Sequence, residues 1–238
     1  MCLLVTRPEP ECERTAALLR SRGHEVLLAP LLRIESVMDA DLGTGPWAAV
    51  LFTSTNAIRA VEAHRRFSEL ADLPAYVVGQ RTRAAAVAAG FTSIMSADGG
   101  VNDLARLIAS NPPVATVPLL YCAGEERAGD LAGALQLQGL RAETAIVYRS
   151  IMVTELTSDT HAALEAGTID AVLHYSARSA AAFLAAVTTA GIRDLSIQIR
   201  HLCLSAQVAA PLAAAGAKSV EVASEPTEQA LLTCVGRV

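Results

Sequence analysis

Small and hydroxylic residues, rather than acids and bases, follow most of the short apolar runs of this sequence. Any one of these serines and threonines could simply cap a helix. Gathered at one edge of a sheet, they would instead form a cleft rich in amide and hydroxyl donors, which suits a polycarboxylate ligand. The segments are Thr6-Arg7, Thr53-Ser-Thr-Asn56, Gly79-Gln-Arg-Thr82, Ser96-Ala-Asp-Gly-Gly100, Ala123-Gly124, Ser176-Ala-Arg-Ser179, Ser205 and Pro226-Thr227.

Tyr148 is the candidate catalytic residue, because its hydroxyl would face the cleft if that side of its strand looks inward. It lies in the apolar run 145–150. A strand tyrosine can pack in a core with its hydroxyl bonded to the backbone, or it can face a cleft. From spacing alone, packing is the simpler interpretation, and the catalytic one stays open.

Several classes of site lack a sequence signal. No phosphate-binding loop and no G-x-G-x-x-G follows a strand, and no serine has the G-x-S-x-G pattern. The five cysteines are scattered, and the five histidines lack metal-ligand spacing. We therefore expect no metal, no nucleotide cofactor and no nucleophilic serine.

Charge and hydropathy narrow the class of protein further. The 238 residues are 52% hydrophobic with a net charge of −5, and the arginines are dispersed. No run approaches the roughly 20 apolar residues that span a bilayer. We expect a globular, cytoplasmic monomer that binds neither nucleic acid nor membrane.

The apolar runs alternate with helix patterns that end at glycine along the whole chain. Residues 2–6, 24–28, 48–53, 75–79, 117–122, 143–148, 170–175, 199–204 and 219–223 read as strands, and helices are expected between most of them, for example at 101–110 and 158–166. This alternation predicts an α/β fold with doubly wound, flavodoxin-like parallel sheets.

An internal repeat sets the expected domain organisation. The segment from Val50 to Arg59 matches that from Val172 to Ala181, and the segment from Val77 to Gly90 matches that from Cys203 to Gly216. A third match is out of order: Leu120-Tyr-Cys-Ala-Gly124 and its helix resemble Leu4-Val-Thr-Arg-Pro8 and its helix. One of two similar domains is therefore inserted in the other.

The same repeat gives the boundaries. We expect a discontinuous domain over 1–34 and 150–238 and an inserted domain over 35–149. The chain would cross between them at two hinge strands, near 31–37 and 145–150.

The motifs together resemble the uroporphyrinogen-III synthase family. They are Val5-Thr-Arg-Pro8, Phe52-Thr-Ser-Thr-Asn-Ala57, Val78-Gly79 with Thr82 and Ala85, Val147-Tyr148, and Ala223-Ser-Glu-Pro-Thr227. No single motif is specific, but their order and the interrupted layout are. The resemblance implies a lyase that cyclises hydroxymethylbilane, with loss of water and inversion of ring D, without cofactor or metal.

The resemblance also implies roles for individual residues. Tyr148 matches the family tyrosine proposed to assist loss of the hydroxyl group. Ser54, Thr82 and Ser176 match carboxylate-binding positions at helix starts, and Thr227 matches a Pro-Thr turn. With the other strand ends, the candidate substrate-binding residues are Thr6, Arg7, Ser54, Thr82, Gly100, Gly124, Ser176, Ser205 and Thr227.

The second repeat departs from the family pattern. Ser205 and Val208 stand where Gly and Thr are usual, and His174-Tyr-Ser-Ala177 stands where Phe-Thr-Ser-Pro is usual. A second hypothesis is a non-catalytic two-domain protein that binds a small anionic ligand, because interrupted two-domain layouts also serve as sensors.

Overall fold

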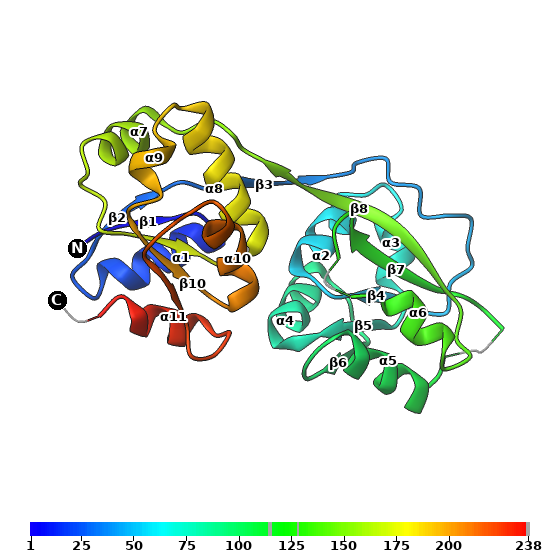
Figure 1. Cartoon of the computed structure of the whole chain (residues 1–238). Coiled ribbons are helices and arrows are strands. Elements are labelled where there is room, and N and C mark those ends of the chain that lie inside the picture. Colours follow the sequence, from blue (N-terminus) through cyan, green and yellow to red (C-terminus); the bar gives the residue numbers. More distant parts are fainter. Residues whose placement is uncertain (114–115, 128, 237–238) are drawn as a thin grey trace. The chain divides into compact units, whose positions relative to one another are not determined.

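Parallel strands and helices alternate along the chain and build two sheets. A computed structural model describes residues 1–113, 116–127 and 129–236. The chain divides into unit 1, Met1–Arg33 with Ile151–Val238, and unit 2, Ile34–Ser150 (Figure 1). The predicted α/β class with mostly parallel sheets is confirmed. Unit 1 consists of two segments of the chain, and unit 2 lies between them in the sequence.

Unit 1 contains a five-stranded parallel sheet in the order β11-β10-β9-β1-β2. Its strands are β1 (Cys2–Val5), β2 (Glu25–Leu28), β9 (Ala171–His174), β10 (Arg200–Cys203) and β11 (Val220–Val222). Its helices are α1 (Glu11–Arg20), α7 (Ser158–Glu165), α8 (Ala177–Thr189), α9 (Arg193–Ser196), α10 (Ala206–Ala214) and α11 (Glu228–Cys234). Read from β2, the order is that of flavodoxin-like sheets.

Unit 2 contains a six-stranded sheet in the order β3-β8-β7-β4-β5-β6. Its strands are β3 (Leu32–Ser36), β4 (Val50–Phe52), β5 (Ala75–Val78), β6 (Ile94–Ala97), β7 (Leu119–Gly124) and β8 (Ala142–Met152). Its helices are α2 (Thr55–Glu62), α3 (Phe67–Ala71), α4 (Gly79–Ala89), α5 (Val101–Ser110) and α6 (Leu131–Gln136).

Alternate residues of each strand enter cores on opposite faces of the sheets, as buried parallel strands require. In unit 1, Leu4 and Val172 pack with α8 and α10, whereas Leu3 and Leu173 pack with α1 and α11. Unit 2 is built likewise, with α2 and α4 on one face and α5 and α6 on the other. Both sheets are therefore covered by helices on both faces.

The strand register agrees with the sequence repeat residue for residue. Val50 pairs with Leu120 in unit 2, and their repeat partners Val172 and Leu4 pair with each other in unit 1. Phe52 pairs with Val77, and their counterparts His174 and Cys203 also pair. Hence β7 takes in unit 2 the place that β1 takes in unit 1, which explains the out-of-order match.

β3 and β8 are the two segments in which the chain crosses between the units. The boundaries fall after Arg33 and after Ser150. Val37 N donates to Val147 O at 2.8 Å, and Val153 N donates to Leu31 O at 2.9 Å. The pairing is therefore antiparallel, in a sheet whose other recorded pairs are parallel.

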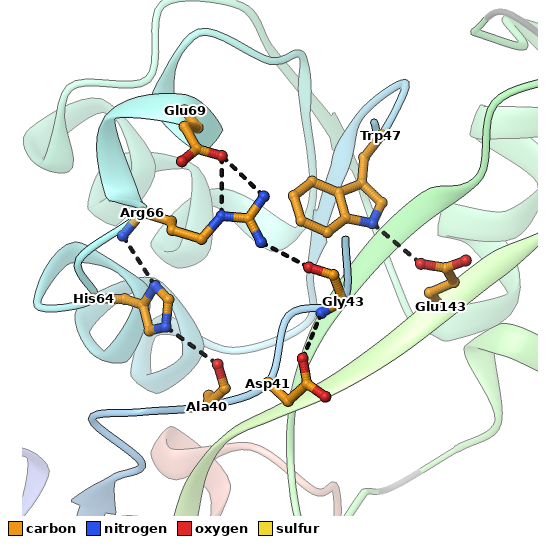
Figure 2. Close-up of polar contacts among 8 residues, drawn as sticks. All are labelled: Ala40, Asp41, Gly43, Trp47, His64, Arg66, Glu69 and Glu143. Carbon is orange, nitrogen blue, oxygen red and sulfur yellow. Dashed lines mark hydrogen bonds and ion pairs between the residues drawn. The ribbon is translucent and has the colours of Figure 1, made fainter. Parts of the chain in front are cut away.

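The loop 37–49 joins β3 to β4 within unit 2. A polar cluster around Trp47 and Arg66 holds it against the rest of that unit (Figure 2). The indole Nε1 of Trp47 donates to Glu143 Oε2 on β8 at 3.2 Å. The guanidinium of Arg66 lies 4.7 Å from the centre of the Trp47 ring and donates to Gly43 O at 2.7 Å. These contacts connect the loop both to β8 and to the segment between α2 and α3.

His64 also belongs to this cluster. Its Nδ1 accepts from Arg66 N at 3.1 Å, so its Nε2 carries the proton that is donated to Ala40 O at 3.2 Å (Figure 2). Glu69 pairs with Arg66 at 2.9 Å and holds the guanidinium in place. The loop is thus hydrogen-bonded to the α2–α3 segment at Ala40 and at Gly43.

Among the residues described, no helix is both long enough and apolar enough to pass through a membrane.

Two histidines are buried side by side in the core of unit 1. His174 on β9 and His201 on β10 are fully buried, and His174 Nε2 lies 3.1 Å from His201 Nδ1. Both rings pack edge-on against Phe183. Burial lowers the pKa of His174 well below its usual value, with a further contribution from His201, and burial lowers the pKa of His201 to about 4.

We predict that this pair makes the protein acid-sensitive. Below pH ~6.5 the unfolded chain takes up protons on these histidines that the folded chain does not, so stability falls as pH falls. The loss from His201 is complete only below its folded pKa of about 4, and amounts to roughly 3 kcal/mol. Urea unfolding between pH 7 and pH 4 measures it.

In the double variant His174→Phe/His201→Leu, the free energy of unfolding should fall much less between pH 7 and pH 4. His161→Gln is the matched control. The side chain of His161 is 37% exposed, so its loss should leave the fall in unfolding free energy at acidic pH unchanged. Equal pH dependence in the double variant and the natural protein would contradict the assignment.

Candidate functional site

A cavity of about 630 Å³ lies in unit 2 at the carboxyl ends of β4, β5 and β7. Ligands of doubly wound sheets bind at this edge. Three predicted residues, Ser54, Gly100 and Gly124, line the cavity together with Tyr148 of β8. Ser54 also caps α2, accepting from Asn56 N at 3.2 Å.

A β-bulge and a glycine set the position of Tyr148. Ala123 of β7 pairs with Ile146, but the next residue, Gly124, pairs with Tyr148, so the register shifts there. Glu125 N donates to Tyr148 O at 3.0 Å. A Cβ atom on Gly124 would lie 2.6 Å from Cζ and 2.8 Å from the hydroxyl oxygen of Tyr148. The phenol therefore lies directly against the backbone of Gly124.

A second phenol reaches the cavity, and the sequence interpretation missed it. The Tyr121 hydroxyl lies 2.9 Å from Thr53 Oγ1, and both residues line the cavity. Burial raises the pKa of Tyr121, against the opposite effect of the hydrogen bond to Thr53. Its position three residues before Gly124, near the end of the same strand, is the signal that could have identified it.

Carboxylates also line the cavity, which the sequence interpretation did not expect. Asp103 accepts from Gly100 N at 2.7 Å and pairs with Arg106. The backbone N–H of Gly100, followed by Arg106, lowers the pKa of Asp103. Asp130 accepts from Gly133 N at 2.9 Å. These two carboxylates are thus capping groups of α5 and α6.

In unit 1, the corresponding strand ends carry an internal ion pair. Arg7 Nη1 lies 2.7 Å from Glu228 Oε1, and the Thr15 hydroxyl donates to the same oxygen at 2.7 Å. The Arg7 guanidinium carbon lies 4.1 Å from the centre of the Tyr175 ring. Burial raises the pKa of Tyr175 to about 12. The predicted anion-binding Arg7 is thus engaged by a carboxylate of the protein itself.

Three of the other predicted residues, Thr6, Ser176 and Thr227, are hydrogen-bonded within the fold. Thr6 is fully buried and donates to Leu173 O at 2.8 Å, and Thr82 is buried within α4. Ser176 accepts from Ser179 N at 3.0 Å and Thr227 from Ala230 N at 3.2 Å, each as the N-cap of its helix. Ser205 occupies the N-cap position of α10 without a side-chain capping bond. Their roles toward a ligand stay predictions.

Across the described residues, no group of three or more His, Cys, Asp or Glu side chains is placed to hold a metal ion.

Comparison with known proteins identifies one family. A family model described as Uroporphyrinogen-III synthase HemD matches residues 13–233. No match occurs among curated proteins.

Solved structures share the fold at low identity. A uroporphyrinogen-III synthetase from Helicobacter pylori is 17% identical with a TM-score of 0.66, covering 99% of this chain and 98% of that one. A mutant uroporphyrinogen III synthase from Thermus thermophilus is 18% identical with a TM-score of 0.53, covering 99% of this chain and 97% of that one.

We predict that Gly124→Ala lowers the free energy of unfolding by about 1–3 kcal/mol, because the new methyl group would overlap the Tyr148 ring. In a Tyr148→Ala background the same change should have little effect, since the ring is gone. Urea unfolding of the four proteins measures the coupling. Equal effects of Gly124→Ala in both backgrounds would show that the ring contact is unimportant.

Proposed function

Because the chain belongs to the uroporphyrinogen-III synthase family, a family of enzymes of heme biosynthesis, we propose that it is a lyase that converts hydroxymethylbilane to uroporphyrinogen III. The observation that carries the proposal is the family match over residues 13–233. The match supports the enzyme over the alternative of a non-catalytic anion-binding protein.

The proposed reaction breaks one C–O bond and closes the ring by C–C bond formation. The terminal hydroxyl of the bilane leaves as water, and the carbon that carried it bonds to the substituted α-carbon of ring D, which gives a spiro intermediate. The bond from that ring D carbon to the methylene of ring C then breaks, and the same methylene bonds to the unsubstituted α-carbon of ring D, so that ring D is inverted. The O–H of Tyr148 supplies the proton that the leaving oxygen needs. Ring closure releases one proton from a pyrrole, which restores the phenol, so that the bilane yields one macrocycle and one water.

Positioning supplies most of the proposed rate enhancement. Holding the flexible bilane folded, so that ring D reaches the reacting carbon, lowers the entropic part of the barrier. The Tyr148 hydroxyl is suited to act on a bound ligand because the pairing of β8 and the backbone of Gly124 fix it beside the cavity. The proposal includes a cytoplasmic monomer that works without cofactor or metal, as the family resemblance implies.

The function is tested by giving purified protein hydroxymethylbilane and resolving the uroporphyrinogen isomers. We expect isomer III. Isomer I is the product of spontaneous closure, and its exclusive formation would refute the proposal.

Tyr148→Phe should lower the turnover number about 100-fold, the lower end of what one general acid contributes, while the unfolding midpoint changes little. Tyr76→Phe is the matched control in the same unit. The Tyr76 hydroxyl donates to Asn111 O at 2.9 Å, and Tyr76 is not among the residues that line the cavity. An unchanged rate for Tyr148→Phe would remove Tyr148 from the mechanism.

A further inference from the structure

The hydroxyl pair formed by Thr53 and Tyr121 has no assigned role in the proposed reaction. Thr53 directly follows β4, and Tyr121 belongs to the neighbouring β7, where it pairs in register with Leu51. Tyr121 is 2% exposed, and it packs in the core with Leu104 and Leu131. Its hydroxyl nevertheless reaches the cavity that Tyr148 lines from β8.

Counting hydrogen atoms shows that this pair retains a free donor. Each hydroxyl has one O–H to donate and lone pairs to accept. The bond between the two oxygens, 2.9 Å long, uses one O–H, whichever residue donates. Within the described part of the chain, no second partner of either hydroxyl is recorded. The other O–H is therefore available to a molecule in the cavity.

A carboxylate of the proposed substrate is a suitable acceptor for that O–H, and Arg127 supplies a cation in the same cavity. Burial keeps the Tyr121 phenol protonated, because it raises the phenol pKa. Arg127 lines the same cavity together with three acidic residues, Asp103, Glu126 and Asp130. Asp103 accepts from Gly100 N and pairs with Arg106, and Asp130 accepts from Gly133 N. A protonated hydroxyl beside a cation matches a carboxylate group.

We propose that Thr53 and Tyr121 form one ligand-binding element that gives a single O–H to a carboxylate of the substrate. This rests on the proposed function, in which the substrate is a linear tetrapyrrole with several carboxylates. The element binds substrate, whereas Tyr148 acts on the leaving oxygen. Its removal should therefore raise KM and leave kcat nearly unchanged.

The test compares Thr53→Val, Tyr121→Phe and the double variant with hydroxymethylbilane as substrate. Either single variant keeps one hydroxyl, freed from its partner, so KM should rise by no more than about twofold. The double variant loses both hydroxyls, and its KM should rise about tenfold, as expected for one hydrogen bond to a charged group.

The urea midpoints of the variants should not follow their KM values. The single variants should lose more stability than the double variant, whereas the double variant should have the highest KM. This difference separates a binding role from a purely structural one. Each single variant leaves a partly or fully buried hydroxyl without its partner, so its urea midpoint should fall. The double variant removes both polar groups and should recover part of that loss. If the pair were only structural, KM would rise most in the least stable variants. The KM of the double variant would then lie closer to the natural value than the KM of either single variant.

Thr53→Ser combined with Tyr121→Phe restores one hydroxyl and should return KM to within about twofold of the natural value. A double variant Thr53→Val/Tyr121→Phe with an unchanged KM would overturn this inference alone, as would a tenfold rise in Tyr121→Phe by itself. A natural protein that forms no isomer III would overturn the proposed function, and this inference with it.

Discussion

The backbone pairing of β8 is the interaction on which the rest of the chain depends. β8 has eleven residues, and the chain leaves unit 2 through it after entering through β3. Hydrogen bonds hold it on both sides, from Val37 N to Val147 O and from Glu125 N to Tyr148 O. The residue on which the proposed chemistry depends is thus placed by main-chain bonds, which a side-chain substitution elsewhere cannot easily shift. Because of the bulge, Tyr148 rather than Val147 pairs with Gly124, and Tyr148 lines the cavity.

The two units share a backbone plan but differ in the chemistry of their strand ends. Thr53 of unit 2 and Tyr175 of unit 1 occupy equivalent places in the repeat, one residue beyond the matched pair Phe52 and His174. In unit 2 this place carries a small hydroxyl that bonds to Tyr121 at the cavity. In unit 1 it carries a phenol ring under Arg7, whose charge is balanced by Glu228. An anion that approaches Arg7 must compete with that internal carboxylate. In the described part of the chain no carboxylate is bonded to the hydroxyl pair of unit 2, although Asp103, Glu126 and Asp130 line the same cavity.

Local patterns predicted the fold well, because alternating hydrophobicity and terminal glycines depend only on neighbouring residues. The helix Val101–Ser110 and the register of the repeat agree with the sequence interpretation. The helix Phe67–Ala71 was missed because one turn leaves too short a pattern. Tyr121 was missed because it belongs to the core and is almost fully buried, although it also lines the cavity. The pair of Arg7 with Glu228 joins residues 221 apart, a contact that only the folded chain defines.

Trp47 gives the molecule a built-in spectroscopic reporter. It is the single tryptophan of the sequence, it is 5% exposed, and it belongs to unit 2. Its indole contacts the guanidinium of Arg66 and the carboxylate of Glu143, both within the same unit, so we expect its emission to change when that unit unfolds (Figure 2). Fluorescence excited at the red edge of the indole band therefore observes unit 2 alone, whereas circular dichroism averages over both. Any difference between the two signals during denaturation measures how far the halves of the chain unfold independently.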